Sequence, residues 1–155
     1  MVITSAAGTT TAVIALSRSA WKLAIALSKL HQDTKVVDST VKDLAGAVKS
    51  LGVEFDLVYA ELEQVISKST AGSLPRHHVD DRIWTCLAAQ MEETSETMHE
   101  VELFVNCDSG EESDPVAQAR RQRRLGESKD QIKSVEKKVY RHANNLHTTV
   151  LLLKA

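Results

Sequence analysis

The feature of this sequence that most constrains its fold is the regular spacing of apolar residues between positions 37 and 65. They recur at alternating intervals of four and three: Val37, Val41, Leu44, Val48, Leu51, Phe55, Val58, Leu62 and Val65. In an α-helix this spacing brings them all onto one face, and such a seam predicts a long helix that packs against neighbouring helices. Gly46 and Gly52 lie off the seam. Each costs ~1 kcal/mol of helix propensity, which does not change the prediction.

Three further segments carry the same spacing of apolar and small residues. The first comprises Val2, Ala6, Thr9, Val13, Leu16, Ala20, Leu23, Leu27 and Leu30; the next Ile83, Leu87, Met91, Thr94, Met98, Val101 and Val105; and the last Ile132, Val135, Val139, His142, Leu146, Thr149 and Leu153. Only six residues are aromatic and eight are Gly or Pro, so turn-forming residues are too few for a sandwich or barrel of many strands.

Loop signals place the ends of the predicted helices. Pro75 and the stretch 108–115 mark loops, Asp114 and Pro115 are typical of a helix start, and Gly126 is typical of a helix end. We therefore predict helices over about 2–30, 36–68, 79–106, 115–124 and 129–153. The expected fold is all-α: a single domain over 1–155 that forms an elongated four-helix bundle with long helices and one short extra helix before the last.

The first predicted helix has a narrow basic side. Arg18, Lys22 and Lys29 lie within ~40° of one another, opposite its apolar face. Four further residues widen the apolar surface: Ile14, Trp21, Ala24 and Ile25. We expect neighbouring helices to cover most of this helix and to leave only a thin basic strip exposed.

The net charge of −2 conceals a strong separation of charge along the chain. Residues 1–78 carry eight basic and seven acidic side chains, residues 79–115 carry one and eleven, and residues 116–155 carry ten and three. The third long helix is thus expected to be acidic and the last one basic. If they are neighbours they attract each other, although exposed ion pairs contribute only ~0–1 kcal/mol each.

No arrangement of residues typical of catalysis is present, and we expect neither an enzyme nor a cofactor or bound metal. Glu96 and His99 form half of a di-iron motif without a second copy and lie off the apolar seam, which favours a solvated acidic face. The run 77–81, with two histidines and two aspartates, could ligate a metal, but acids at a helix start are better explained by the helix dipole. His142 lies on an apolar face, where a hydrogen-bonded core histidine is expected.

Two cysteines and the absence of a signal peptide favour a cytoplasmic protein. On one continuous helix Cys86 and Cys107 would lie roughly 31 Å apart, too far to form a disulfide. The first 17 residues are uncharged, but no basic residue precedes them as in a secretory signal, and the stretch is short for a membrane span.

Two segments are candidates for contact with other molecules. Arg120, Arg121, Arg123 and Arg124 form the densest charge run, which is either a solvated helix face or a patch for anionic lipid or a protein partner. Nucleic acid is not expected, because no aromatic residue lies between these arginines to stack on bases. Near the N-terminus small residues recur every four positions, which permits close helix packing within the bundle or self-association in a membrane.

The chain also resembles a known family over nearly its whole length. The residues that carry the resemblance are 2–8 and 12–16 in the first helix, Leu44, Leu51 and Leu62 in the second, Cys86 and Glu92-Glu93-Thr94 in the third, and 132–135 and 146–152 in the last. Together they resemble the HeLo-like N-terminal domains of fungal STAND (NOD-like) receptors. The resemblance implies an effector bundle at the N-terminus of a larger signalling protein, which a downstream sensor domain oligomerises and whose first helix then reaches the membrane.

Two functions follow as hypotheses. In the first, the domain is an immune or cell-death effector that associates with the membrane when it is activated. Its insertion residues would be Val2, Ile3, Gly8, Ala12, Val13, Ile14 and Leu16, and the arginines at 120–124 would bind anionic headgroups. In the second, it is a non-lytic module that self-associates or docks onto a protein partner through its charged faces.

Overall fold

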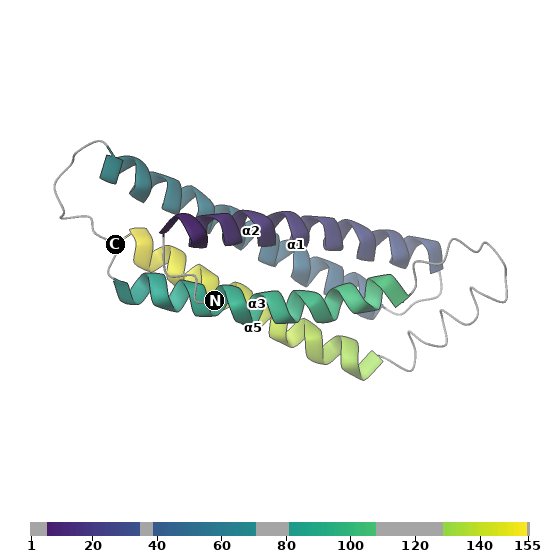
Figure 1. Cartoon of the computed structure of the whole chain (residues 1–155). Helices are drawn as coiled ribbons and strands as arrows, with labels where there is room; N and C mark the ends of the chain where they lie inside the picture. The colour runs from purple at the N-terminus through teal and green to yellow at the C-terminus, as the bar shows by residue number, and fades with distance from the viewer. Residues whose placement is uncertain (1–5, 35–38, 71–80, 108–128, 155) are drawn as a thin grey trace.

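The computed structural model describes residues 6–34, 39–70, 81–107 and 129–154, and all of them are helical (Figure 1). The helices are α1 (Ala6–Thr34), α2 (Ser39–Thr70), α3 (Asp81–Cys107) and α5 (Lys129–Lys154). These ranges contain no strand, which confirms the all-α class. The short helix predicted at 115–124 lies outside the described residues.

The four helices form a ring in which each one packs against two others. α1 and α5 each contact α2 and α3, whereas α1 does not contact α5 and α2 does not contact α3. Polar contacts give the directions. Ion pairs join His147 to Glu54 and Lys154 to Glu61, so α5 runs parallel to α2. The opposite order of partners makes α1 antiparallel to α2 and α3 antiparallel to α5, as Figure 1 shows.

The net charge on each helix agrees with this order. α1 has three basic and one acidic residue and α5 has six and two, so their net charges are +2 and +4. α2 has three basic and five acidic residues and α3 has one and six, which gives −2 and −5. Every contacting pair therefore joins a positive to a negative helix, and helices of like sign lie on the diagonals. A ring in sequence order would instead place α2 beside α3 and α1 beside α5.

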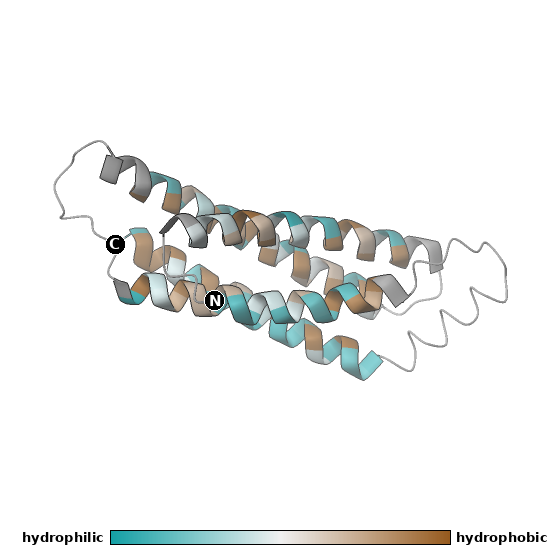
Figure 2. Ribbon diagram, in the orientation of Figure 1, coloured by the Kyte–Doolittle hydropathy of each residue, from teal (hydrophilic) through white to brown (hydrophobic). Residues whose placement is uncertain are grey.

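The predicted apolar seams form the core of the bundle. On α2 every seam residue from Val41 to Leu62 is buried, and Phe55 is the largest fully buried side chain. Burial of one such side chain contributes ~1.5–3 kcal/mol. Figure 2 shows apolar and hydrophilic residues alternating along each helix, as expected of helices with a single buried face.

Neighbouring helices cover most of the described side chains of α1, as expected, but the placement of Ile25 is wrong. Ile25 was expected to widen the buried surface, but 69% of it is exposed, because it lies on the same side of the helix as Lys22 and Lys29. α1 has only two neighbours in the ring, and they cover the opposite side.

The two glycines of α2 have different surroundings. A Cβ atom added at Gly52 would lie 3.1 Å from Nε1 of Trp21, so the absence of a side chain there lets the indole ring of α1 approach α2. A Cβ atom at Gly46 would meet nothing within 4 Å. Gly52 thus has a packing role between α1 and α2, which Gly46 does not have within one molecule.

These surroundings predict opposite effects on stability. Gly46→Ala should raise the free energy of unfolding by ~1 kcal/mol, because alanine is the better helix former and its methyl group enters open space. Gly52→Leu should lower it by ~2 kcal/mol, because the side chain displaces Trp21. Urea denaturation of dilute protein measures both values, and equal effects at the two positions would contradict the proposed packing of Trp21 on Gly52.

Candidate functional site

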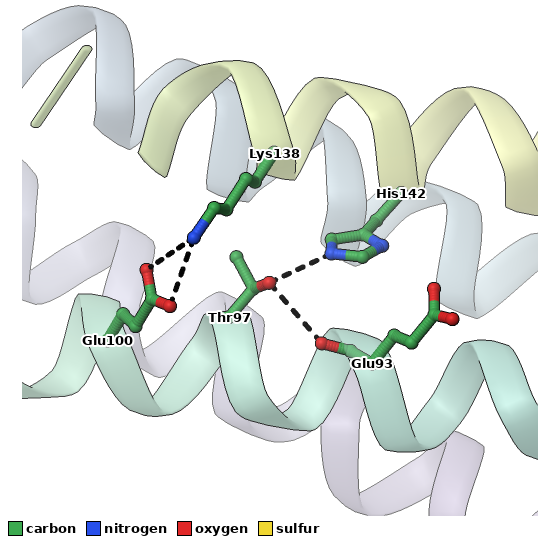
Figure 3. A network of polar contacts seen from close by, with 5 residues as sticks. All are labelled: Glu93, Thr97, Glu100, Lys138 and His142. Atoms are coloured by element: carbon green, nitrogen blue, oxygen red, sulfur yellow. Dashed lines mark hydrogen bonds and ion pairs between the residues drawn. The ribbon is translucent and has the colours of Figure 1, made fainter. Parts of the chain in front are cut away.

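A buried histidine, His142, lies in a cluster of polar side chains between α3 and α5. His142 Nε2 lies 2.8 Å from the hydroxyl oxygen of Thr97, and that hydroxyl also lies 3.3 Å from the carbonyl oxygen of Glu93 (Figure 3). Thr97 can accept a hydrogen bond from the neutral imidazole while it donates one to the carbonyl. One turn further along α3, Lys138 Nζ contacts both carboxylate oxygens of Glu100 at 3.2 and 3.3 Å.

The surroundings of His142 favour its neutral form. Burial lowers the pKa of His142 below its ordinary value, the positive charges of Arg141 and Lys138 lower it further, and the carboxylate of Glu93 opposes the shift. The predicted hydrogen-bonded core histidine is therefore confirmed. Its partner is a hydroxyl that also donates to the backbone, so the group fixes the register of α3 against α5.

The contact between α2 and α5 combines favourable and unfavourable charges. Glu54 and Glu61 of α2 pair with His147 and Lys154 of α5. Glu136 of α5 faces like charge instead: burial first, and then the carboxylate of Asp43, raise its pKa. Lys133 and Lys137 oppose this shift of the pKa of Glu136, and the two ion pairs between the helices lie toward the end of α5.

A basic and partly apolar surface runs along the outer side of α1. We call it the α1 basic ridge: Arg18, Lys22, Ile25 and Lys29, all of which are exposed. The three cations have no ion-pair partner among the residues that the structure describes, and α1 contains no acidic residue before Asp33. An exposed isoleucine surrounded by unpaired cations can contact an apolar surface that carries negative charge.

A second polar group joins α1 to α2 immediately after the predicted insertion residues, which end at Leu16. Asp56 of α2 accepts a hydrogen bond from the Ser17 hydroxyl with one carboxylate oxygen and a 3.0 Å hydrogen bond from Trp21 Nε1 with the other. We call these three residues the Asp56 cluster. Together with Gly52, which contacts the same indole ring, they hold the middle of α1 against α2.

The predicted insertion residues within the described part of α1 occupy different environments. Val13 is fully buried in the core, and the others, Gly8, Ala12, Ile14 and Leu16, are half-buried. Between them the hydroxyl group of Thr9 is fully buried without a hydrogen-bond partner, which is unfavourable by ~1–3 kcal/mol. Val2 and Ile3 lie outside the described residues, as do Arg120, Arg121, Arg123 and Arg124.

The sequence did not reveal two parts of this surface. The Asp56 cluster joins residues about 40 positions apart, and no local pattern marks Asp56 among the other acids of α2. The position of Ile25 could have been found, because its angle around the helix falls beside those of Arg18, Lys22 and Lys29. Its apolar character alone favours the buried face, and that prediction is wrong.

Neither a metal centre nor a membrane span is found in the residues that the structure describes. Among them no three His, Cys, Asp or Glu side chains lie close enough together to hold a metal ion. None of the described helices combines the length and the apolar character that crossing a bilayer requires.

Comparisons with known proteins give no family assignment. No family model matches the chain, and no curated protein or solved structure is significantly similar to it. The functional argument therefore depends on the surfaces described above.

The low pKa of His142 predicts a loss of stability in mild acid. The unfolded chain takes up a proton near pH 6.5 more readily than the folded protein does, so the free energy of unfolding should fall as the pH decreases below about 6.5. His142→Leu should remove this part of the pH dependence, because leucine has no group that takes up a proton. The variant should still fold, because Thr97 keeps its hydrogen bond to the Glu93 carbonyl. Denaturation curves at several pH values measure the effect.

The matched control is His99→Gln, which removes a histidine from the exposed face of α3 and leaves His142 and Thr97 in place. If His142→Leu and the wild type lost stability equally between pH 7 and pH 5, the role assigned to His142 would be wrong.

Proposed function

We propose that this chain is a signalling or effector bundle that acts at an anionic membrane surface in the cytoplasm, as the first domain of a STAND-type immune protein. The observation that carries the proposal is the α1 basic ridge, in which three unpaired cations surround an isoleucine that is 69% exposed. The resemblance of the sequence to HeLo-like domains supports the same class of function.

The ridge has the composition of a surface that binds a membrane from one side. Each Lys or Arg near an anionic bilayer contributes ~1 kcal/mol to binding, and an apolar side chain between them can enter the interface. The ridge itself contains no acidic residue, and the carboxylate of Asp56 beside it is hydrogen-bonded to Ser17 and Trp21. The arginines at 120–124 would add to this attraction if they reach the same surface.

In this proposal the N-terminal part of α1 is the segment that leaves the bundle when the domain oligomerises. From Gly8 to Leu16 only Val13 is fully buried among the aliphatic side chains, and the buried Thr9 hydroxyl opposes packing there. Release would expose Val2, Ile3, Gly8, Ala12, Val13, Ile14 and Leu16 to the membrane, and the Asp56 cluster would set the limit of the released segment.

A second candidate function is an adaptor module that docks a protein partner without contact with lipid. Leu103 is 52% exposed on the outer side of α3, on the same side as the exposed acids Glu92 and Glu96. Such a face suits a basic helix with an apolar side chain. In that case binding to the partner would weaken in high salt, and vesicles would not bind.

The first prediction of the proposal concerns vesicle binding by the folded domain. Vesicles that contain anionic lipid should bind the protein at low salt, and neutral vesicles should not. Lys22→Gln combined with Lys29→Gln should weaken binding about thirtyfold, at ~1 kcal/mol for each charge, and Ile25→Ser should weaken it further. Co-sedimentation with vesicles at two salt concentrations measures these effects.

The control variant for that experiment loses the same charge from the outer face of α5. Lys133→Gln with Lys137→Gln should bind the vesicles nearly as well as the wild type. If both pairs of substitutions weakened binding equally, attraction would come from the overall charge of the domain and not from the α1 basic ridge.

The second prediction concerns the release of α1. Asp56→Ala removes both hydrogen bonds of the Asp56 cluster, so it should increase dye leakage from anionic vesicles severalfold at equal amounts of bound protein. Asp43→Ala on the same helix makes the same change of charge away from α1 and should leave leakage unchanged. Unaltered leakage with Asp56→Ala would remove the release step and leave binding of the folded bundle in place.

A further inference from the structure

The side of α2 that faces away from the core carries a second regular pattern. We call it the α2 outer stripe: Gly46, Ser50, Val53, Leu57, Ala60 and Gln64, which are all exposed and uncharged. Their spacing is four, three, four, three and four, which is the heptad spacing of helices that pack in pairs. At 100° per residue the stripe lies roughly opposite the buried seam. Val53 and Leu57, at its centre, are 42% and 40% exposed.

Gly46 has no packing neighbour within one molecule, which favours a contact with a second one. A glycine inside a helix lowers its stability relative to alanine, so it is expected where a neighbour must come close. Gly52 has such a neighbour in Trp21, whereas a Cβ atom at Gly46 would meet nothing within 4 Å. One turn later the small side chain of Ser50 donates a hydrogen bond to the Gly46 carbonyl, so it stays close to the helix backbone. The stripe therefore offers close approach at one end and aliphatic contact at its centre.

We propose that the α2 outer stripe packs against the same stripe of a second copy of this chain, in an antiparallel contact with two-fold symmetry. In the register centred on residue 55, Val53 meets Leu57 of the second copy, Ser50 meets its Ala60, and Gly46 meets its Gln64. In a two-fold contact both copies use the same surface, so the assembly stops at a dimer.

The charges beside the stripe support this register. Lys49, Asp56 and Glu63 are exposed and flank the stripe along the same side at intervals of seven residues. The carboxylate of Asp56 is held by Ser17 and Trp21 of α1, and Glu63 accepts a 2.9 Å hydrogen bond from Tyr59 with one of its oxygens.

The antiparallel register brings Lys49 of each copy near Glu63 of the other, so the attraction occurs twice. It also places the two Asp56 residues nearest the two-fold axis, where Ser17 and Trp21 hold each carboxylate toward its own α1. Glu54 on the opposite flank is turned into the bundle toward His147 and is only 19% exposed, which keeps its carboxylate from the second copy.

The contact involves one pair of helices, so the dimer should be weak. Interfaces below ~1,200 Å² are typical of transient association, and we expect a dissociation constant in the micromolar range or weaker. The α1 basic ridge lies on another helix and shares no residue with the α2 outer stripe. The dimer can therefore form whether or not the domain binds membranes, and it gives the predicted self-association a defined surface.

Sedimentation equilibrium of the whole chain from micromolar to millimolar concentration tests the proposal. The wild type should dimerise reversibly, and Gly46→Leu should weaken the dimer about tenfold. The substitution should leave the monomer folded, because a Cβ atom at Gly46 meets nothing within 4 Å there. Ala89→Leu makes a similar exposed change on α3 and should leave the dimer unchanged.

Charge reversal tests the register. Lys49→Glu and Glu63→Lys should each weaken the dimer, because two attractions become two repulsions, and the double variant should restore it to within a few-fold of the wild type. Lys137→Glu on α5 is the control for a charge change elsewhere and should have little effect. Circular dichroism at low concentration reports whether each variant is folded.

Three results would overturn the proposal. A wild type that stays monomeric at every concentration removes the dimer. A dimer that Gly46→Leu does not weaken belongs to another surface. A double reversal that fails to restore association contradicts the antiparallel register, because in a parallel contact Lys49 and Glu63 would not meet.

Discussion

The buried face of α2 is the contact on which the other helices depend. α2 packs on α1 along one flank and on α5 along the other, and its seam is buried from Val41 to Leu62. Burial of apolar surface has no direction, however, so four seams of similar composition can be packed in more than one order. The net charges of the helices differ between these orders and agree with the observed one. Only the observed ring gives every helix two neighbours of opposite sign.

The long helices could be predicted from the sequence because a heptad pattern is local information. Residues such as Leu44, Leu87 and Leu146 are buried, as their heptad spacing on one face of each helix predicts. The charge of each segment was equally readable, and the acidic α3 does pack against the basic α5, where Lys138 pairs with Glu100. The order of the ring was not predicted, because it depends on comparing the charges of all helices at once.

The features that sequence reasoning missed depend on pairs of residues far apart in the chain. Gly46 lies on the exposed side of α2 and Gly52 on a buried side, and the partner that gives Gly52 its packing role, Trp21, comes from another helix. The same ring binds Asp56, so one aromatic side chain of α1 determines the role of two residues of α2. Ile25 shows the converse error: an apolar residue within a basic face was assigned to the core because of its type and not because of its angle.

The directions of the helices have a consequence for anything attached to the domain. α1 runs antiparallel to α2, and α2 runs parallel to α5, so the beginning of α1 and the end of α5 lie at the same end of the bundle (Figure 1). A further domain tethered after α5 would therefore emerge beside the first turns of α1. Its bulk could shield those turns sterically, and a change in its assembly state could uncover them without any rearrangement of the core.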